Sequence, residues 1–246
     1  MRLILLALFA LVAFPAQAAA PEELSALDAL FTRRGEPAAV KELEERLEKA
    51  LKATPEDFEV LWRTARLRHW QADLAGSGNQ KKLLGRQAWE LGERARKLRP
   101  ERVEGHFFAA VGIGDYSQAV GILQALTEGL EGKFNERLEL ALKIDPAFDR
   151  AGPLLAKGRY HYELPWPKRD LKKSASHLQK ALAQHPESLR AWFYLAETLL
   201  ADGEEKKAHE AILKVSQGST AYDPAEGQLM QRWAKKLQPR IEKELE

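Results

Sequence analysis

The chain of 246 residues contains no cysteine. Disulfide bonds, thiolate nucleophiles, cysteine-ligated zinc and iron–sulfur clusters are therefore excluded, and so is a lipid attached through an N-terminal cysteine. An excess of charge of one sign is also lacking, since 38 Lys and Arg residues stand against 36 Asp and Glu residues and the formal net charge is +2. Because this balance gives no general attraction to nucleic acid, we expect no nucleic-acid partner.

Long apolar runs are absent after the first residues of the chain. Arg2 precedes an apolar run over residues 3–14, and Ala16-Gln17-Ala18 follows with small residues at the positions typical of a signal-peptidase site. The run is shorter than the ~20 apolar residues that span a bilayer. We therefore predict a signal peptide over residues 1–18 and a periplasmic or exported protein. After cleavage this protein is expected to be soluble, without stable membrane insertion; retention of the segment as an anchor is the alternative.

A six-residue pattern ending in proline occurs four times. Each copy closes a segment with apolar residues at helical spacing, and proline cannot continue a helix because it lacks an N–H and clashes with the preceding turn. Segments that alternate apolar and polar residues, as strands require, are missing. The copies are Ala50-Leu51-Lys52-Ala53-Thr54-Pro55, Ala95-Arg96-Lys97-Leu98-Arg99-Pro100, Ala141-Leu142-Lys143-Ile144-Asp145-Pro146 and Ala181-Leu182-Ala183-Gln184-His185-Pro186. The pattern predicts helices that end shortly before each of these prolines.

The residues after Pro186 fit the tetratricopeptide repeat. Trp192-Phe193-Tyr194-Leu195-Ala196 is followed by a turn glycine, Gly203, and by Ala208 and Ile212 on a second helix. The prolines lie farther apart than the about 34 residues of a standard repeat. We therefore predict an all-α fold, a tetratricopeptide-like solenoid of helical hairpins with enlarged repeats. Its expected parts are N-terminal helices over 19–54, the repeat domain over 55–221 and a C-terminal capping helix over 222–246.

Glycine-rich and proline-rich segments mark where the repeats are enlarged. We place the additional residues between the two helices of each hairpin, at 76–79, 112–132 and 164–167. Insertions of this kind gather on one face of a solenoid, and such faces often bind partners. Gly112-Ile113-Gly114 is interpreted as a helix C-terminus and not as a nucleotide loop, because it lacks the third glycine and a strand before it.

Four segments together resemble a known group of proteins. They are Leu61-Trp62-Arg63-Thr64-Ala65-Arg66, Gly105-His106-Phe107-Phe108-Ala109-Ala110-Val111, and residues 135–146 followed by Leu164-Pro165-Trp166. Over residues 43–215 the chain is similar to the enlarged tetratricopeptide proteins of the regulator of microtubule dynamics family. It also resembles the related T component of tripartite ATP-independent periplasmic (TRAP) transporters. The resemblance implies an all-α interaction protein, a scaffold or adaptor, without a catalytic centre.

Reactive side chains show no arrangement typical of an active site. The six histidines are scattered without metal-ligand spacing, and the clustered glutamates lie among basic residues at helical spacing, as on a solvated face. We therefore expect no catalytic residues, no metal and no cofactor. Aromatic and basic residues are the candidates for partner binding, and Trp166 stands out because two prolines frame it. The candidate partner-binding residues are Trp62, Arg66, His106, Tyr162, Trp166 and Trp192.

Two functions are compatible with these observations. The first is a non-catalytic periplasmic scaffold or adaptor that binds a protein partner in a cell-envelope assembly for transport, secretion or motility. The alternative is an auxiliary module of a TRAP-type transport system that binds a small apolar ligand in a cleft lined by aromatic residues. An α-helical hydrolase is the third and weakest hypothesis. The oligomeric state and the identity of the partner stay open.

Overall fold

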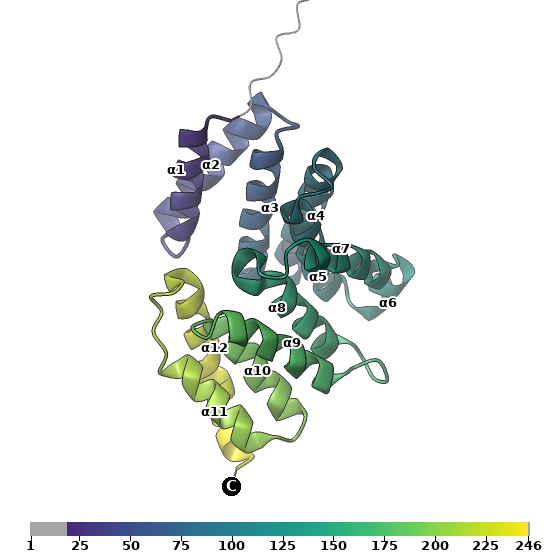
Figure 1. The fold of residues 1–246 in the computed structure, drawn as a ribbon, viewed down its shortest axis with the longest axis vertical. Helices are drawn as coiled ribbons and strands as arrows, with labels where there is room; N and C mark the ends of the chain where they lie inside the picture. Colours follow the sequence, from purple (N-terminus) through teal and green to yellow (C-terminus); the bar gives the residue numbers. More distant parts are fainter. Residues whose placement is uncertain (1–18, 246) are drawn as a thin grey trace, which may run out of the picture.

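The computed structural model describes residues 19–245, so the predicted signal peptide lies outside the described residues (Figure 1). Within this range all regular structure is helical, which confirms the predicted fold class. None of the helices within residues 19–245 is both long and apolar enough to cross a membrane. The helices are α1 (Pro21–Thr32), α2 (Pro37–Ala53), α3 (Phe58–Asp73), α4 (Gly78–Leu98), α5 (Val103–Val120), α6 (Ile122–Thr127), α7 (Leu130–Ile144), α8 (Phe148–Glu163), α9 (Leu171–Gln184), α10 (Leu189–Ala201), α11 (Glu205–Ser216) and α12 (Pro224–Lys243).

The four proline-ending patterns close helices as predicted. α2, α4, α7 and α9 each end within three residues of the proline, and the next helix starts after a short turn. The repeated alanines of α4, α7 and α9 are buried, because each small side chain lies where neighbouring helices come close. The hairpins that follow pair α3 with α4, α5 with α7, α8 with α9, and α10 with α11. The chain is thus a tetratricopeptide-like solenoid.

Part of the enlargement lies in the helices and not in loops. Gly78 and Asn79 are the first residues of α4, which is 21 residues long. The interpretation of Gly112 as a helix C-terminus is wrong, since α5 continues to Val120. The physical reason is close packing: a Cβ atom on Gly112 would lie 2.3 Å from the amide nitrogen of Trp89 in α4. This glycine lets two helix backbones touch in the middle of both helices.

The other predicted insertions are loops or short helices. Between α5 and α7 the chain forms the six-residue helix α6, none of whose residues is buried. Gly121 and Gly129 flank α6 with φ angles of 81° and 62°, in the region that only glycine adopts without strain. Between α8 and α9, residues 164–170 form a loop that contains the predicted insertion. In Figure 1, α6 and this loop project from the same side of the molecule.

The two ends of the solenoid meet. Arg34, just after α1, forms a buried ion pair of 2.5 Å with Asp223, the N-cap residue of α12. A Cβ atom on Gly35 would lie 3.3 Å from the side chain of Ala225. Side chains of α1, α2, α10, α11 and α12 share one hydrophobic cluster, in which Leu30, Phe193 and Leu229 are buried. The helices therefore curve into a closed shape with space at its centre.

Candidate functional site

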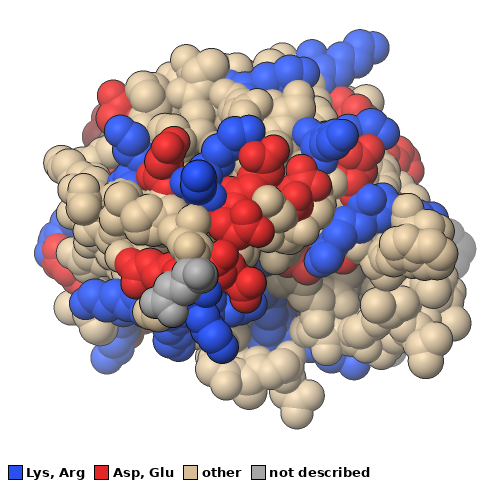
Figure 2. Space-filling model, turned by 90° about the horizontal axis from the view of Figure 1, so that it is seen from below, with Lys and Arg blue, Asp and Glu red and all other residues tan. Residues whose placement is uncertain are grey.

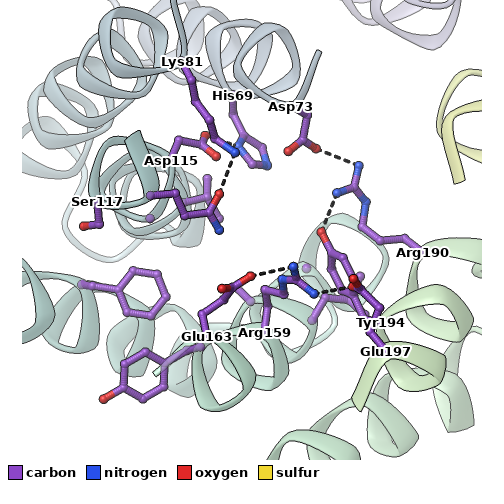
Figure 3. Close-up of a pocket in the computed structure, with 18 of the residues that line it drawn as sticks. His69, Asp73, Lys81, Asp115, Ser117, Arg159, Glu163, Arg190, Tyr194 and Glu197 are labelled. Atoms are coloured by element: carbon purple, nitrogen blue, oxygen red, sulfur yellow. Dashed lines mark hydrogen bonds and ion pairs between the residues drawn. The ribbon is translucent and has the colours of Figure 1, made fainter. Parts of the chain in front are cut away.

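A cavity of about 960 Å³ occupies the centre of this closed shape. Its wall is formed mainly by the first helix of each hairpin, α3, α5, α8 and α10, and is completed by parts of α1, α6, α7 and α12. Figure 3 shows charged side chains on opposite sides of the open space. Aromatic rings also line the cavity, among them Phe107, Phe108, Phe134, Phe193 and Trp233. The cavity can therefore receive an apolar group and hold a polar one.

On one side, His69 of α3 contacts Asp115 of α5. The His69 Nδ1 atom lies 2.6 Å from Oδ2 of Asp115, whose carboxylate is almost wholly buried. Burial by itself lowers the pKa of His69, but the Asp115 carboxylate more than compensates, so that the pKa is raised above its ordinary value. Lys81 of α4 lies nearby and donates a 2.6 Å hydrogen bond to Gln118. This side of the cavity thus carries paired acid and base, held by three helices.

On the opposite side, two arginines hold together the hairpins that form the wall. Arg190 of α10 lies 2.8 Å from Asp73 of α3 and donates a 2.8 Å hydrogen bond to the Tyr194 hydroxyl. Arg159 of α8 pairs with Glu163 at 2.6 Å and with Glu197 of α10 at 2.5 Å. Since acidic groups already occupy these two guanidinium groups, their contacts fix the shape of the cavity and leave little free charge for a ligand.

The mouth of the cavity carries exposed apolar side chains. Trp166 is 89% exposed, and Ile122, Leu123 and Leu126 of α6 are 59%, 81% and 61% exposed. Ile122 and Trp166 line the main cavity and also a neighbouring hollow of about 570 Å³. Large exposed apolar residues that gather at one place are typical of a site that binds another molecule. The mouth, defined by α6 and residues 164–167, is thus an exposed apolar part of the site.

Charge of one sign does not accumulate on the face in Figure 2. Acidic side chains lie beside basic ones across that face, which is the molecule seen from below. Residues 19–245 contain no group of three or more His, Asp or Glu side chains placed to bind a metal ion. The site therefore consists of an apolar cavity, paired charges in its wall and an apolar mouth.

Two of the six candidate residues line the cavity, namely Arg66 and Trp166. Trp62 is buried beside Arg66, where its ring stacks on that of Phe108 at 6.1 Å between centroids. His106 is also buried, with Nε2 2.8 Å from the carbonyl oxygen of Pro100.

The last two candidates are half-buried outside the cavity. Tyr162 lies beneath the guanidinium groups of Arg159 and Arg169, with 4.7 and 5.0 Å from the guanidinium carbons to the ring centroid. Trp192 donates a 2.9 Å hydrogen bond to the carbonyl oxygen of Pro186.

Sequence reasoning missed the polar residues of the cavity wall. His69 and Asp73 are four residues apart in α3, as are Arg159 and Glu163 in α8 and Arg190 and Tyr194 in α10. Residues at this spacing share one face of a helix. The first helix of each hairpin is otherwise rich in buried residues. Polar pairs at this spacing on successive first helices were therefore the sequence signal for a polar cavity wall.

The comparisons with known proteins agree with this architecture. The sequence model described as "Regulator of microtubule dynamics protein 1-3" matches residues 24–240. The chain belongs to the regulator of microtubule dynamics family. The match runs from α1 to α12 and therefore covers nearly all of the described helices of this family member.

One solved structure shows the same kind of fold. A thermophilic tetratricopeptide-repeat protein of Thermus thermophilus is 20% identical, with a TM-score of 0.64 over 86% of this chain and 98% of that one. Yeast Tom70 is 17% identical, with a TM-score of 0.45 over 83% of this chain and 46% of that one. No curated protein matches the chain. The fold of this family member is therefore that of a tetratricopeptide-repeat protein.

Proposed function

We propose that this protein is a periplasmic, non-catalytic scaffold that binds a protein partner of a cell-envelope assembly for transport, secretion or motility. The observation that carries the proposal is the central cavity with its apolar mouth. A wall built from successive first helices presents side chains along a continuous inner surface, which suits a segment of a partner chain. The apolar run over residues 3–14 and Ala16-Gln17-Ala18 support the periplasmic location.

Trp166 is the residue that the partner is expected to contact first. It is exposed between Pro165 and Pro167, so its substitution removes apolar contact area without opening the helical core. The test is crosslinking capture from envelope extracts with the wild type, with Trp166→Ala, and with Leu83→Ala as the matched control. Leu83 of α4 is 59% exposed but does not line the cavity.

The expected result is a partner crosslinked by the wild type and by Leu83→Ala, with at least tenfold less product for Trp166→Ala, as for the loss of a residue central to an interface. Helical content measured by circular dichroism should be equal in all three proteins. Equal capture by Trp166→Ala would contradict the role of the mouth. The same preparation tests the location: the protein should be released by osmotic shock, with Ala19 as its first residue.

A second candidate function is favoured by the volume of the cavity. About 960 Å³ lies at the upper end of the roughly 300–1,000 Å³ typical of small-molecule sites, and the lining includes many aromatic rings. The protein then acts as a small-ligand module, as in a TRAP-type system. Native mass spectrometry of the purified protein distinguishes the two functions, because a small ligand adds a mass far below that of a protein partner.

A further inference from the structure

One end of the cavity is built from arginine and aromatic side chains stacked alternately. The order is Trp62, Arg66, Phe31, Arg34 and Trp70, which we call the arginine stack. The guanidinium carbon of Arg66 lies 4.8 Å from the ring centroid of Trp62 and 3.9 Å from that of Phe31. The guanidinium carbon of Arg34 lies 4.5 Å from the Phe31 centroid and 4.7 Å from that of Trp70. All members except Trp62 line the cavity.

Several N–H groups of this stack have no acceptor. Nε of Arg34, Nε of Arg66 and Nε1 of Trp70 are buried without a hydrogen-bond partner in the described chain. They are three of the six buried, unpaired side-chain atoms found in residues 19–245. Buried donors are nearly always paired in folded proteins, so three unpaired ones within a single stack indicate that an acceptor belongs there.

The charge of Arg66 is also incompletely neutralised. Its Nη2 atom contacts Asp28 at 2.5 Å, but Arg63 already holds both oxygens of that carboxylate at 3.1 and 2.7 Å. Burial lowers the pKa of Arg66, and the carboxylates of Asp149 and Asp28 offset this only in part. Among the ion pairs of residues 19–245, Arg66 pairs with Asp28 and not with Asp149. The hydrogen bond of the Arg66 side chain to Asp28 uses Nη2, and Nη1 is not one of the buried, unpaired atoms of residues 19–245.

The charge balance indicates what kind of anion fits. Arg34 shares the buried carboxylate of Asp223 with Arg150, which also lines the cavity. Arg66 shares Asp28 with Arg63, and Arg63 also pairs with Glu59 at 2.6 Å. These four arginines thus face three carboxylates at ion-pair distance, which leaves an excess of roughly one positive charge. This excess matches a monoanion better than a doubly charged phosphate group. The rings of Phe107, Phe108 and Phe193 line the same cavity and offer an apolar surface to the rest of the ligand.

We propose that the arginine stack binds the carboxylate of a ligand whose apolar body lies in the cavity. This inference rests on the proposed function of the cavity as the binding site. Two sources offer the same chemistry: a free carboxylic acid with an apolar chain, or the C-terminal carboxylate of an apolar peptide. In both, one carboxylate oxygen approaches Nη1 of Arg66, and small side-chain shifts give the buried N–H groups of the stack access to the ligand.

The test compares acids with matched amides by calorimetric titration of the purified protein. The probes are octanoate and octanamide, and the N-acetylated peptide Phe-Leu-Leu with a free or an amidated C-terminus. The variants are Arg66→Gln, which removes the charge, Trp70→Phe, which removes the N–H but keeps a ring, and Arg68→Gln as the control. Arg68 is also in α3, is similarly buried and does not line the cavity. Arg63 still holds Asp28 in Arg66→Gln, so this variant is expected to fold.

An acid that binds at least tenfold more tightly than its amide supports the proposal, provided that Arg66→Gln removes this preference and Arg68→Gln keeps it. A charge-assisted hydrogen bond accounts for a tenfold to hundredfold preference. Trp70→Phe should weaken the binding of the acid several-fold. The probe pair that shows the preference identifies the source of the carboxylate.

Equal affinity for acid and amide in both pairs would overturn the carboxylate site while leaving the cavity as an apolar binding site. A preference that survives in Arg66→Gln would overturn it as well. If none of the four probes binds, the carboxylate site and the small-ligand function both fail. The capture of a protein partner through Trp166 is measured separately, so its outcome shows whether the scaffold function fails too.

Discussion

The ion pair between Arg34 and Asp223 closes the solenoid, and its removal has a calculable effect. Both side chains are buried, with exposed fractions of 6% and 4%, although they are 189 positions apart in the sequence. Asp223 also accepts a hydrogen bond from the Glu226 amide as the N-cap of α12. The substitution Arg34→Met leaves this carboxylate buried with Arg150 as its remaining cation, at 3.1 Å.

Removal of one partner from a buried ion pair costs about 3–5 kcal/mol, because the remaining charge stays desolvated. Since Arg150 still contacts Asp223, we expect the lower end, about 3 kcal/mol. For a chain of this size that corresponds to a fall in Tm of roughly 6–12 °C. Urea unfolding followed by circular dichroism measures the free energy, and thermal unfolding measures the Tm.

Two further variants separate this ion pair from general effects of substitution. The double variant Arg34→Met/Asp223→Asn removes both charges and keeps an N-cap, so it should recover most of the lost stability. Arg33→Met breaks the neighbouring exposed pair with Glu36 and should have little effect, since both side chains are more than half exposed. The stabilising role of this ion pair is refuted if Arg34→Met has the same free energy of unfolding as the wild type. It is also refuted if the double variant is no more stable than the single one.

Two other predictions concern packing and protonation. Gly112→Ala should lower the free energy of unfolding in urea by about 1–3 kcal/mol or more, because the new methyl group meets the α4 backbone. Gly132→Ala is the control: no atom lies within 4 Å of the added Cβ, so this variant should be neutral or slightly stabilising. The raised pKa of His69 means that the folded chain binds a proton more tightly than the unfolded chain. Its contribution to stability is therefore complete below pH ~6.5 and is lost as the pH rises through the folded pKa. Asp115→Asn should flatten this part of the pH profile; an unchanged slope above pH ~6.5 would contradict the pairing.

Local rules explain which parts of this fold were predictable. Proline lacks an N–H and disfavours continuation of a helix, so the ends of α2, α4, α7 and α9 could be found from sequence where an amphipathic segment precedes the proline. The rule is not absolute, since Pro239 lies inside α12. Gly112 could not be understood in the same way, because its role depends on the backbone of α4, which passes beside it only in the folded chain. The contact of Arg34 with Asp223 has no local signature either, since no periodic pattern links residues so far apart.

The candidate site was predicted in part for the same reason. Aromatic and basic residue types drew attention to Trp62 and Arg66, which do stack, and to Trp166, which is exposed at the mouth. His106 and Trp192 have the same chemical character but bond to carbonyl groups outside the cavity. Residue type indicates what a side chain can bind, whereas the curvature of the solenoid decides which side chains reach the centre.

Closure of the solenoid fixes how many repeats the chain can have. In an open array each repeat contacts only its neighbours, so repeats can be added or deleted without loss of the others. Here the ends of the solenoid meet where Arg34, after α1, pairs with Asp223, before α12. Each hairpin is rotated relative to the one before it, and the sum of these rotations brings the two ends together. One hairpin more or fewer would separate the two ends and abolish the central space. Length variation in this family is therefore expected in segments such as α6 and residues 164–170, which lie outside the closed circuit.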